Sequence, residues 1–388
     1  MLPTPALDRT RFAAIEAAIT TYIDEGKMPG AVFLLERAGE QHARAFGRQT
    51  FAAESAAIGL DTVFDAASLT KVMATAPAIM MLVDEGKLAI DLPLTRYLPE
   101  CTGGGKEPIT LRHLLTHTSG LPAGLPPTPA WRGETAALQL ACAEVVTHPP
   151  GTFFRYSDIN FILLGLVAQR VSGVPFHEFV RARILAPLGM RQTGFLPLAR
   201  VSPTMIAPTQ KMRDAAHQPL HADLAPGEEL RGTVHDPTVR FMGGVGGSAG
   251  LFTTVGDVAR YARMILNEGE LDGVRILSKE SVAAMRSVQS PPGVEWRRSL
   301  GWDIDSPYAR PRGSLFPVGS FGHTGFTGCI FWIDPFSRTF FVFLSNRVYP
   351  DDRANILDLY GRLGTLSAEA VAGYDFANVP GALPGKSP

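Results

Sequence analysis

The sequence has little cysteine and almost no net charge. Its 388 residues include three cysteines, and 36 Lys and Arg stand against 37 Asp and Glu. Without a surplus of positive charge there is no basic stripe to follow a phosphate backbone, so we expect no nucleic-acid partner. Acidic runs are missing as well. We therefore expect the partner to be a small molecule, and the sequence indicates no oligomeric state.

The three cysteines, Cys101, Cys142 and Cys329, lie far apart in the sequence and are odd in number. A disulfide-stabilised domain usually carries an even number at close spacing, and a zinc site needs closely spaced pairs. The sequence therefore predicts neither a disulfide framework nor a zinc site.

Long apolar runs are also missing. No segment approaches the roughly 18 consecutive apolar residues of a membrane span, so we expect no membrane contact. Near the start, Asp8, Arg9 and Arg11 precede any apolar run, which is not the order of a secretory signal. From the sequence as given, we expect a cytoplasmic protein.

The spacing of apolar residues changes along the chain and predicts different secondary structures in different parts. Apolar residues recur at helical spacing between Phe12 and Ile23, where Asp8 can cap the helix and Gly26 can end it. Two short strands are predicted next, at 32–36 and 42–46. The pattern is then mainly helical from 68 to 188, and Pro77 is expected to kink or break the first of these helices.

In the last part of the chain, loop, helix and strand patterns follow one another. A Pro-rich stretch over 196–237 predicts a long loop, followed by these expected elements: a helix at 255–269, strands at 327–334 and 339–346, and a helix at 354–366. Strands near both ends, with helices between them, imply one antiparallel sheet assembled from both ends of the chain.

These patterns predict the fold class α/β (α+β). We expect one domain over 1–388, in which an antiparallel sheet is flanked by the terminal helices. Its α/β part covers about 1–67 and 240–388. The inserted helical subdomain covers about 68–239.

One serine and one lysine stand out where the helical pattern begins. Ser68 and Lys71 are three residues apart, so they share a helix face, and no other serine has Lys at this spacing. A lysine can deprotonate a serine once desolvation or a nearby cation lowers its pKa from about 10.4. The Ser68 amide, near the positive end of that helix, can stabilise an oxyanion. The alternative is a helix-capping serine beside a solvated lysine.

Two later segments add to this pair. Tyr156 lies on a turn before an apolar helix, where it can relay a proton to a leaving group. His323, Thr324 and Gly325 are expected to precede a strand whose edge amides form the rest of an oxyanion hole, with the glycine allowing the backbone to approach substrate.

Other motifs have weaker interpretations. Residues 246–250 match the G-x-S-x-G nucleophile elbow around Ser248, but no buried strand precedes them, which favours a packed loop. Residues 244–249 formally match a dinucleotide fingerprint but lack a βαβ unit. His113 and His117 have the spacing of zinc ligands, yet Leu114 replaces the glutamate of a zincin, so structural hydrogen bonds are favoured.

Two further positions stay open. The His235-Asp236 pair either borders the cleft or fixes its loop. Asp158 caps the helix predicted to begin at Ile159, faces the substrate, or does both.

The chain resembles the serine β-lactamase and penicillin-binding protein superfamily, and most closely its class C β-lactamase-like branch. The resemblance runs through FDAASLTKV, ITLRHLLTHTSGLP, PPGTFFRYSDINFILLG, GTVHDPTVRFMGGVGGSAGLFTT, FGHTGFTGCIFWIDP and LSNRVYP. It implies a serine β-lactamase-like fold and a serine hydrolase. It also implies that Ser68 is the acylated nucleophile, Lys71 the general base and Tyr156 the proton relay, with the backbone amides of Ser68 and Phe326 as the oxyanion hole.

Two departures from the family pattern bear on substrate. Asp158 replaces the usual Asn two residues after the tyrosine, and a carboxylate cannot donate to an acylamino carbonyl. His323 replaces the lysine of Lys-Thr-Gly and offers at most a partial positive charge near neutral pH. We take Asp158, His323, Thr324 and Gly325 as the substrate-binding residues.

Both departures favour neutral esters, so the predicted activity is that of a carboxylesterase. A D-alanyl-D-alanine carboxypeptidase or weak β-lactamase is the second interpretation. A sensor that is acylated but does not turn over is a third, from a different class. No metal or organic cofactor is expected, and the substrate is a small ester or amide.

Overall fold

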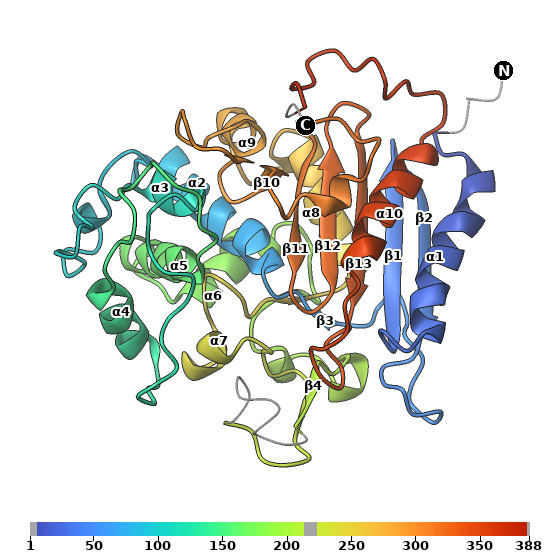
Figure 1. Ribbon diagram of the computed structural model, residues 1–388, viewed down its shortest axis with the longest axis horizontal. Coiled ribbons are helices and arrows are strands. Elements are labelled where there is room, and N and C mark those ends of the chain that lie inside the picture. Colours follow the sequence, from blue (N-terminus) through green and yellow to red (C-terminus); the bar gives the residue numbers. More distant parts are fainter. Residues whose placement is uncertain (1–5, 213–222, 386–388) are drawn as a thin grey trace.

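A seven-stranded sheet, antiparallel at every pairing, lies among helices in the computed structural model, which describes residues 6–212 and 223–385 (Figure 1). The strand order is β2-β1-β13-β12-β11-β10-β9. These strands are β1 (Gly30–Arg37), β2 (Glu40–Gly47), β9 (Arg297–Arg298), β10 (Asp303–Asp305), β11 (Phe321–Gly325), β12 (Cys329–Asp334) and β13 (Thr339–Ser345). Short two-stranded pairs lie outside the sheet: β3 (Phe64–Asp65) with β6 (Phe252–Thr253), β4 (Gln210–Lys211) with β5 (Glu229–Leu230), and β7 (Glu270–Leu271) with β8 (Val274–Arg275).

The centre of the sheet is built from apolar runs. Strands β12 and β13 are buried along their whole length, and β1 nearly so, because helices cover both faces of the sheet. Strand β1 pairs with β13 from Ala31 opposite Ser345 to Arg37 opposite Thr339. The predicted antiparallel sheet, assembled from both ends of the chain, is therefore confirmed.

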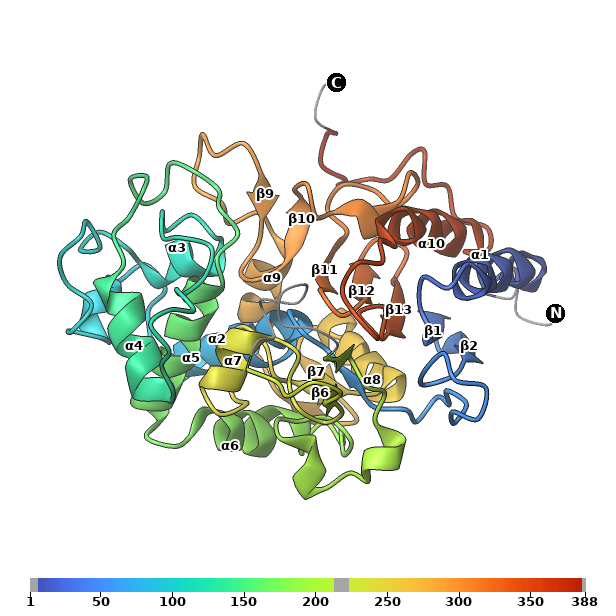
Figure 2. The same ribbon diagram turned by 60° about the horizontal axis from the view of Figure 1, so that its bottom comes forward.

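The helices form three groups around this sheet. Helices α1 and α10 lie side by side on one face, α8 covers the other face, and the remaining helices extend beyond the β9 edge (Figure 2). The helices are α1 (Phe12–Asp24), α2 (Ala76–Asp84), α3 (Leu111–Leu115), α4 (Glu134–Ala143), α5 (Asp158–Ser172), α6 (Phe176–Val180), α7 (Pro237–Phe241), α8 (Val255–Leu266), α9 (Lys279–Arg286) and α10 (Leu357–Glu369). Within the described ranges no single helix is long and apolar enough to cross a membrane; one bent pair, Asp158–Ser172 with Phe176–Leu185, passes by length and composition.

Local sequence accounts for how these helices begin. The Asp8 side chain caps the short 3-10 turn that leads into α1, as expected. Pro77 lies in the first turn of α2, and a π-helical turn, Lys71–Thr75, comes directly before it. Because proline has no N–H to complete the regular ladder, the predicted interruption falls here. Lys71 lies in this widened turn.

The predicted absence of a disulfide is wrong. Cys101 and Cys142 form one, joining the loop after Leu98 to the end of α4, while Cys329 is free and buried in β12. The two bonded cysteines are 41 positions apart in the sequence. Their encounter depends on how the helices pack, which the spacing of three cysteines does not reveal.

Other predictions were incomplete. In the 196–237 stretch, residues 213–222 lie outside the described residues, and the rest is loop broken by short helical turns and the β4–β5 pair. Helix α9 and strands β9 to β11 were not predicted. His323, Thr324 and Gly325 precede the predicted strand, which is β12, and they also lie within a strand of their own, β11. With two glycines in five residues, β11 has little strand propensity of its own and depends on pairing with β12.

Candidate active site

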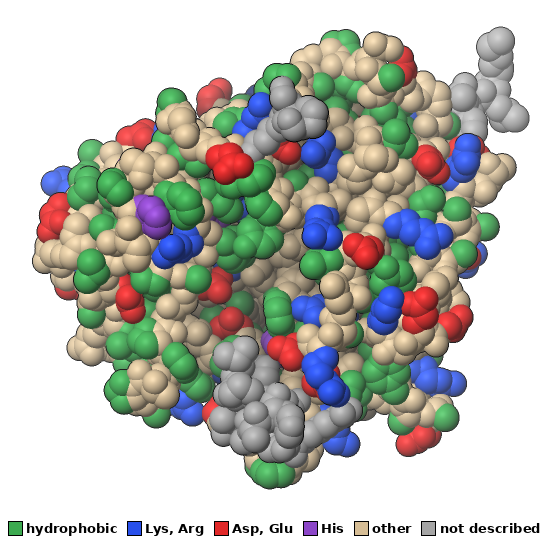
Figure 3. Space-filling view, viewed as in Figure 1, with side chains coloured by type: hydrophobic (Ala, Val, Ile, Leu, Met, Phe, Trp, Pro, Cys, Tyr) green, Lys and Arg blue, Asp and Glu red, His purple; other side chains and the backbone are tan. Residues whose placement is uncertain are grey.

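Ser68 lies at the end of a tight turn that follows β3. Ala67 in this turn has a left-handed backbone, with φ of 45°. The Asp65 carboxylate stabilises the turn, because it accepts a hydrogen bond from the backbone N–H of Ala67 at 2.8 Å. It also accepts one from the backbone N–H of His235 at 2.7 Å, which links the turn to the loop before α7. Burial raises the pKa of Asp65 to about 6. Ser68 thereby lines a cavity of about 430 Å³ between the sheet and the helical group, on the face shown in Figure 3.

Lys71 is fully buried and is surrounded by oxygen atoms. Its Nζ donates to Ser68 Oγ at 3.0 Å and to the Ser248 carbonyl at 2.8 Å, and it forms an ion pair with Asp158 Oδ1 at 2.7 Å. The predicted pairing of serine and lysine is thus present in the structure. The contact with Asp158 was not predicted.

Asp158 changes the chemistry of this lysine. Burial disfavours the ammonium form, but the negative charge of Asp158, with Tyr156 adding to it, outweighs burial and raises the pKa of Lys71 above its ordinary value. The expectation that the surroundings would lower this pKa is therefore wrong. Lys71 is an ammonium ion at neutral pH and becomes a base only as the pH rises.

Tyr156 lies beside Lys71, just before α5. Its ring centroid is 5.1 Å from Lys71 Nζ and 4.3 Å from the His117 ring, on which it stacks. His117 Nδ1 accepts a hydrogen bond from the Ser157 backbone N–H at 3.1 Å. Since burial lowers the pKa of His117 well below its ordinary value, this ring is a neutral support for the tyrosine.

Strand β11 forms the opposite wall of the cavity. His323, Thr324, Gly325 and Phe326 all line it. A Cβ atom added to Gly325 would lie 2.6 Å from the Ala66 carbonyl oxygen. The glycine therefore allows β11 to approach the turn that carries Ser68, while the approach of its backbone to substrate stays a prediction.

Two backbone amides of the cavity are available for a ligand. In the described parts of the chain, neither the Ser68 N–H nor the Phe326 N–H donates a hydrogen bond to another residue. Both residues line the cavity. This arrangement fits the pair of donors that an oxyanion hole needs.

His323 is neutral in this structure. Its Nδ1 lies 2.8 Å from the Thr324 carbonyl oxygen, which can only accept, so the proton is on Nδ1 and Nε2 is left as an acceptor. Burial, with the positive charges of Arg298 and Lys71 adding to it, lowers the pKa of His323 well below its ordinary value. This agrees with the expectation that His323 offers at most a partial positive charge near neutral pH.

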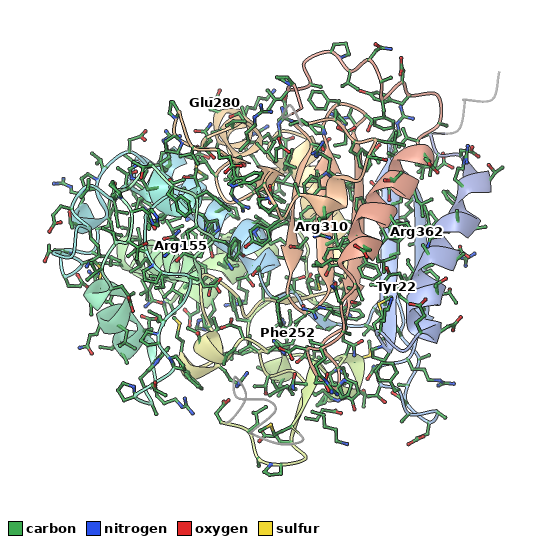
Figure 4. The ribbon with its side chains drawn as sticks, in the orientation of Figure 1. Tyr22, Arg155, Phe252, Glu280, Arg310 and Arg362 are labelled. Atoms are coloured by element: carbon green, nitrogen blue, oxygen red, sulfur yellow. A yellow bond between two sulfur atoms is a disulfide. The ribbon has the colours of Figure 1, made fainter. Side chains whose placement is uncertain are left out.

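Further residues line the cavity that the sequence did not single out. Figure 4 labels Arg155 in the helical group and Arg310 on the side of the sheet. The lining residues not predicted are Arg298, Asp303, Tyr308, Arg347, Asp352, Arg353, Ala354, Asn355, Ile356, Leu357 and Tyr360. They come from β9, β10 and the chain after β13, where sequence patterns gave no chemical signal.

The weaker motifs of the sequence have structural roles. Ser248 is 1% exposed, and the loop around it packs against the π-helical turn, where Thr75 Oγ1 also donates to the Gly247 carbonyl. His113 forms a capping box with Thr110 at the start of α3. No group of three or more metal-ligating side chains is found in the described part of the chain.

Asp236, whose role the sequence left open, caps α7 by accepting from the Val239 backbone N–H at 2.8 Å. Burial, followed by the negative charge of Asp158, raises its pKa. The ring of His235 is 5.7 Å from that of Phe326. Asp236 thus fixes its loop, and His235 contacts a residue of the cavity wall, Phe326, without lining the cavity itself.

Comparison with known families agrees with this geometry. The family described as Beta-lactamase matches residues 15–365. The chain belongs to the β-lactamase family. It is 32% identical over 303 residues to a protein of Escherichia coli K12 named "Putative D-alanyl-D-alanine carboxypeptidase", covering 74% of this chain and 69% of that one.

Solved structures of β-lactamase-like proteins share the fold. A class C β-lactamase superposes with a TM-score of 0.72 at 19% identity, covering 94% of this chain and 98% of that one. EstCE1, described as a hydrolase with promiscuous acyltransferase activity, gives 0.72 at 22% identity, covering 94% and 99%. The predicted superfamily and fold class are confirmed, and the protein is a serine hydrolase of the β-lactamase family.

Proposed function

We propose that this β-lactamase-family protein hydrolyses neutral carboxylic esters through an acyl-enzyme on Ser68. The observation that supports it is His323, a neutral side chain on the cavity wall where a lysine would attract a carboxylate. The other cations of the wall already have acceptors: Arg347 donates to the Asp352 and Ala354 carbonyls, and Arg353 pairs with Asp351. A neutral ester suits this wall better than an anionic substrate.

In the proposed reaction, Ser68 Oγ bonds to the ester carbonyl carbon while its proton passes to neutral Lys71. The Ser68 and Phe326 amides donate to the resulting oxyanion. The bond to the alcohol oxygen then breaks, and the alcohol leaves with the proton, relayed by Tyr156. Water adds to the acyl carbon and gives up a proton to neutral Lys71. The bond to Ser68 then breaks and the proton passes from Lys71 to the serine oxygen, which releases the carboxylic acid and restores the serine.

The second candidate is a D-alanyl-D-alanine carboxypeptidase. It is favoured by the identity of 32% to the E. coli protein of that name. Arg347 and Arg353 also lie on the cavity wall, where a peptide carboxylate could compete for them.

Mass spectrometry of the intact protein, followed over time, separates these functions. The probes are p-nitrophenyl butyrate, benzylpenicillin and diacetyl-L-lysyl-D-alanyl-D-alanine. A transient butyryl adduct with release of butyrate supports the esterase. Release of D-alanine without butyrate turnover supports the carboxypeptidase, and a permanent penicilloyl adduct with no turnover of either substrate indicates a sensor.

The nucleophile is tested with two serine variants. Ser68→Ala should abolish ester turnover and labelling by a fluorophosphonate, whereas Ser248→Ala, a matched change at a buried serine, should keep the labelling. Labelling that survives in Ser68→Ala and disappears in Ser248→Ala would overturn the assignment.

A further inference from the structure

Arg298 is a buried cation that none of the sequence motifs contains. It lies on β9, is fully buried, and lines the same cavity as Ser68. Its guanidinium donates to Asp303 Oδ2 at 3.2 Å and to the Gly301 carbonyl at 3.0 Å, while its Nε is buried without a partner in the described structure. These contacts fix the guanidinium in one place.

The guanidinium lies beside two aromatic rings that precede α5. Its central carbon is 6.0 Å from the centre of the Tyr156 ring and 5.7 Å from that of Phe154. An arginine keeps its charge throughout the pH range of enzymes, so this charge is permanent. It is also felt by His323 and His117, both of which it keeps neutral together with burial.

We propose that Arg298 is a positioning residue for acylation, whose buried charge stabilises the negative charge that builds up at Tyr156 as the Ser68 proton is relayed. The proposal rests on the proposed function. Arg298 is fully buried and its guanidinium lies beside the Tyr156 ring, so we infer that it acts through Tyr156. It supplies from β9 the positive charge that His323 does not supply from β11.

The titratable groups around Arg298 come from several elements. Asp303 on β10 is its ion-pair partner and the nearest negative charge. The other groups that face Arg298 or the Tyr156 ring are His117 after α3, Asp158 on α5, Lys71 in the π-helical turn, Tyr308 after β10 and His323 on β11. Of these, Asp303 can be neutralised without touching Ser68, Lys71 or Tyr156.

Three variants test the proposal, using the full chain and the pH dependence of two rates. One rate is kcat/KM for p-nitrophenyl butyrate, and the other is the rate of Ser68 labelling by a fluorophosphonate, in which the serine oxygen bonds to phosphorus and fluoride leaves. Arg298→Gln removes the positive charge, Asp303→Asn removes the negative charge, and Arg298→Lys keeps the positive charge with altered geometry. All three break or weaken the same ion pair.

A positive charge near the base lowers the pH at which the base becomes active. In Arg298→Gln, the pH at which both rates rise should therefore increase by about one unit. In Asp303→Asn that pH should decrease, and in Arg298→Lys it should stay unchanged. A purely structural ion pair would reduce the rates of all three without changing that pH, and that result would overturn the proposal. If the ester is not turned over at all, the proposed function fails, while the labelling profile still decides the role of Arg298.

Discussion

Asp158 raises the pKa of Lys71, the base of the proposed reaction. It lies 2.7 Å from Lys71, and its charge raises the pKa of that lysine even though Lys71 is fully buried. In the proposed reaction only neutral Lys71 can take the Ser68 proton. A raised pKa leaves little of that form at neutral pH, so kcat/KM should rise with pH into the alkaline range.

Asp158→Asn should move that rise to lower pH. Without the carboxylate, the burial of Lys71 is no longer outweighed and lowers its pKa. The pH at which kcat/KM rises should therefore decrease by about one unit or more, and activity at pH 7 should increase. The measurement is a pH profile with p-nitrophenyl butyrate.

Asp352→Asn is the matched control, since Asp352 also lines the cavity but forms no ion pair with Lys71. If the pH at which kcat/KM rises does not change in Asp158→Asn, Lys71 is not the titrating base.

At the scale of secondary structure, the sequence predicted the elements whose own residues favour their conformation. It did not predict the elements whose conformation depends on neighbouring strands or helices. Strands β12 and β13 could be predicted from their continuous apolar runs, because a strand that is buried on both faces needs no polar positions. Strand β11 could not be identified from FGHTG, since its conformation comes from pairing with β12. Likewise, Asp158 and Lys71 are 87 positions apart, and only the packing of α5 against the π-helical turn makes them partners.

The disulfide between Cys101 and Cys142 is a testable link between elements. Disulfides persist mainly in oxidising compartments, which makes the predicted cytoplasmic location worth testing by cell fractionation. The bond closes a loop of about 40 residues, so Cys142→Ser should lower the free energy of unfolding by about 2–4 kcal/mol in oxidising buffer.

The measurement is urea denaturation with and without dithiothreitol. The reductant should destabilise the wild type and leave Cys142→Ser unchanged. Thiol titration of the unreduced, denatured wild type should find only Cys329; three reactive thiols would show that the bond does not form.

On the scale of the whole molecule, buried acids lie where the helical group meets the sheet. Burial raises the pKa of Asp65 to about 6 and also raises that of Asp236. An acid whose pKa is higher in the folded than in the unfolded state destabilises the fold when ionised. This destabilisation is present above the folded pKa and is relieved as the pH falls toward the unfolded value near 3.9.

Asp236→Asn should therefore change how stability depends on pH. When the pH falls from 7.5 to 5.5, only the wild type gains a proton at this site, and this proton stabilises its fold. The free energy of unfolding of the variant should therefore fall relative to that of the wild type, by on the order of 1 kcal/mol. Asparagine keeps the cap on α7, and other titrating groups cancel in the difference. Urea denaturation at both pH values measures it; a difference that does not change with pH contradicts the raised pKa.

The pairing of β1 with β13 has a consequence for how the protein is made. Ser345 follows its partner Ala31 by 314 positions. At about 5–20 residues per second, a ribosome needs roughly 16 to 63 seconds to reach it. During that time the β1–β2 hairpin has an unpaired edge of apolar residues, and unpaired edges invite contacts with other chains. The nascent protein is therefore expected to need protection from aggregation until β13 emerges.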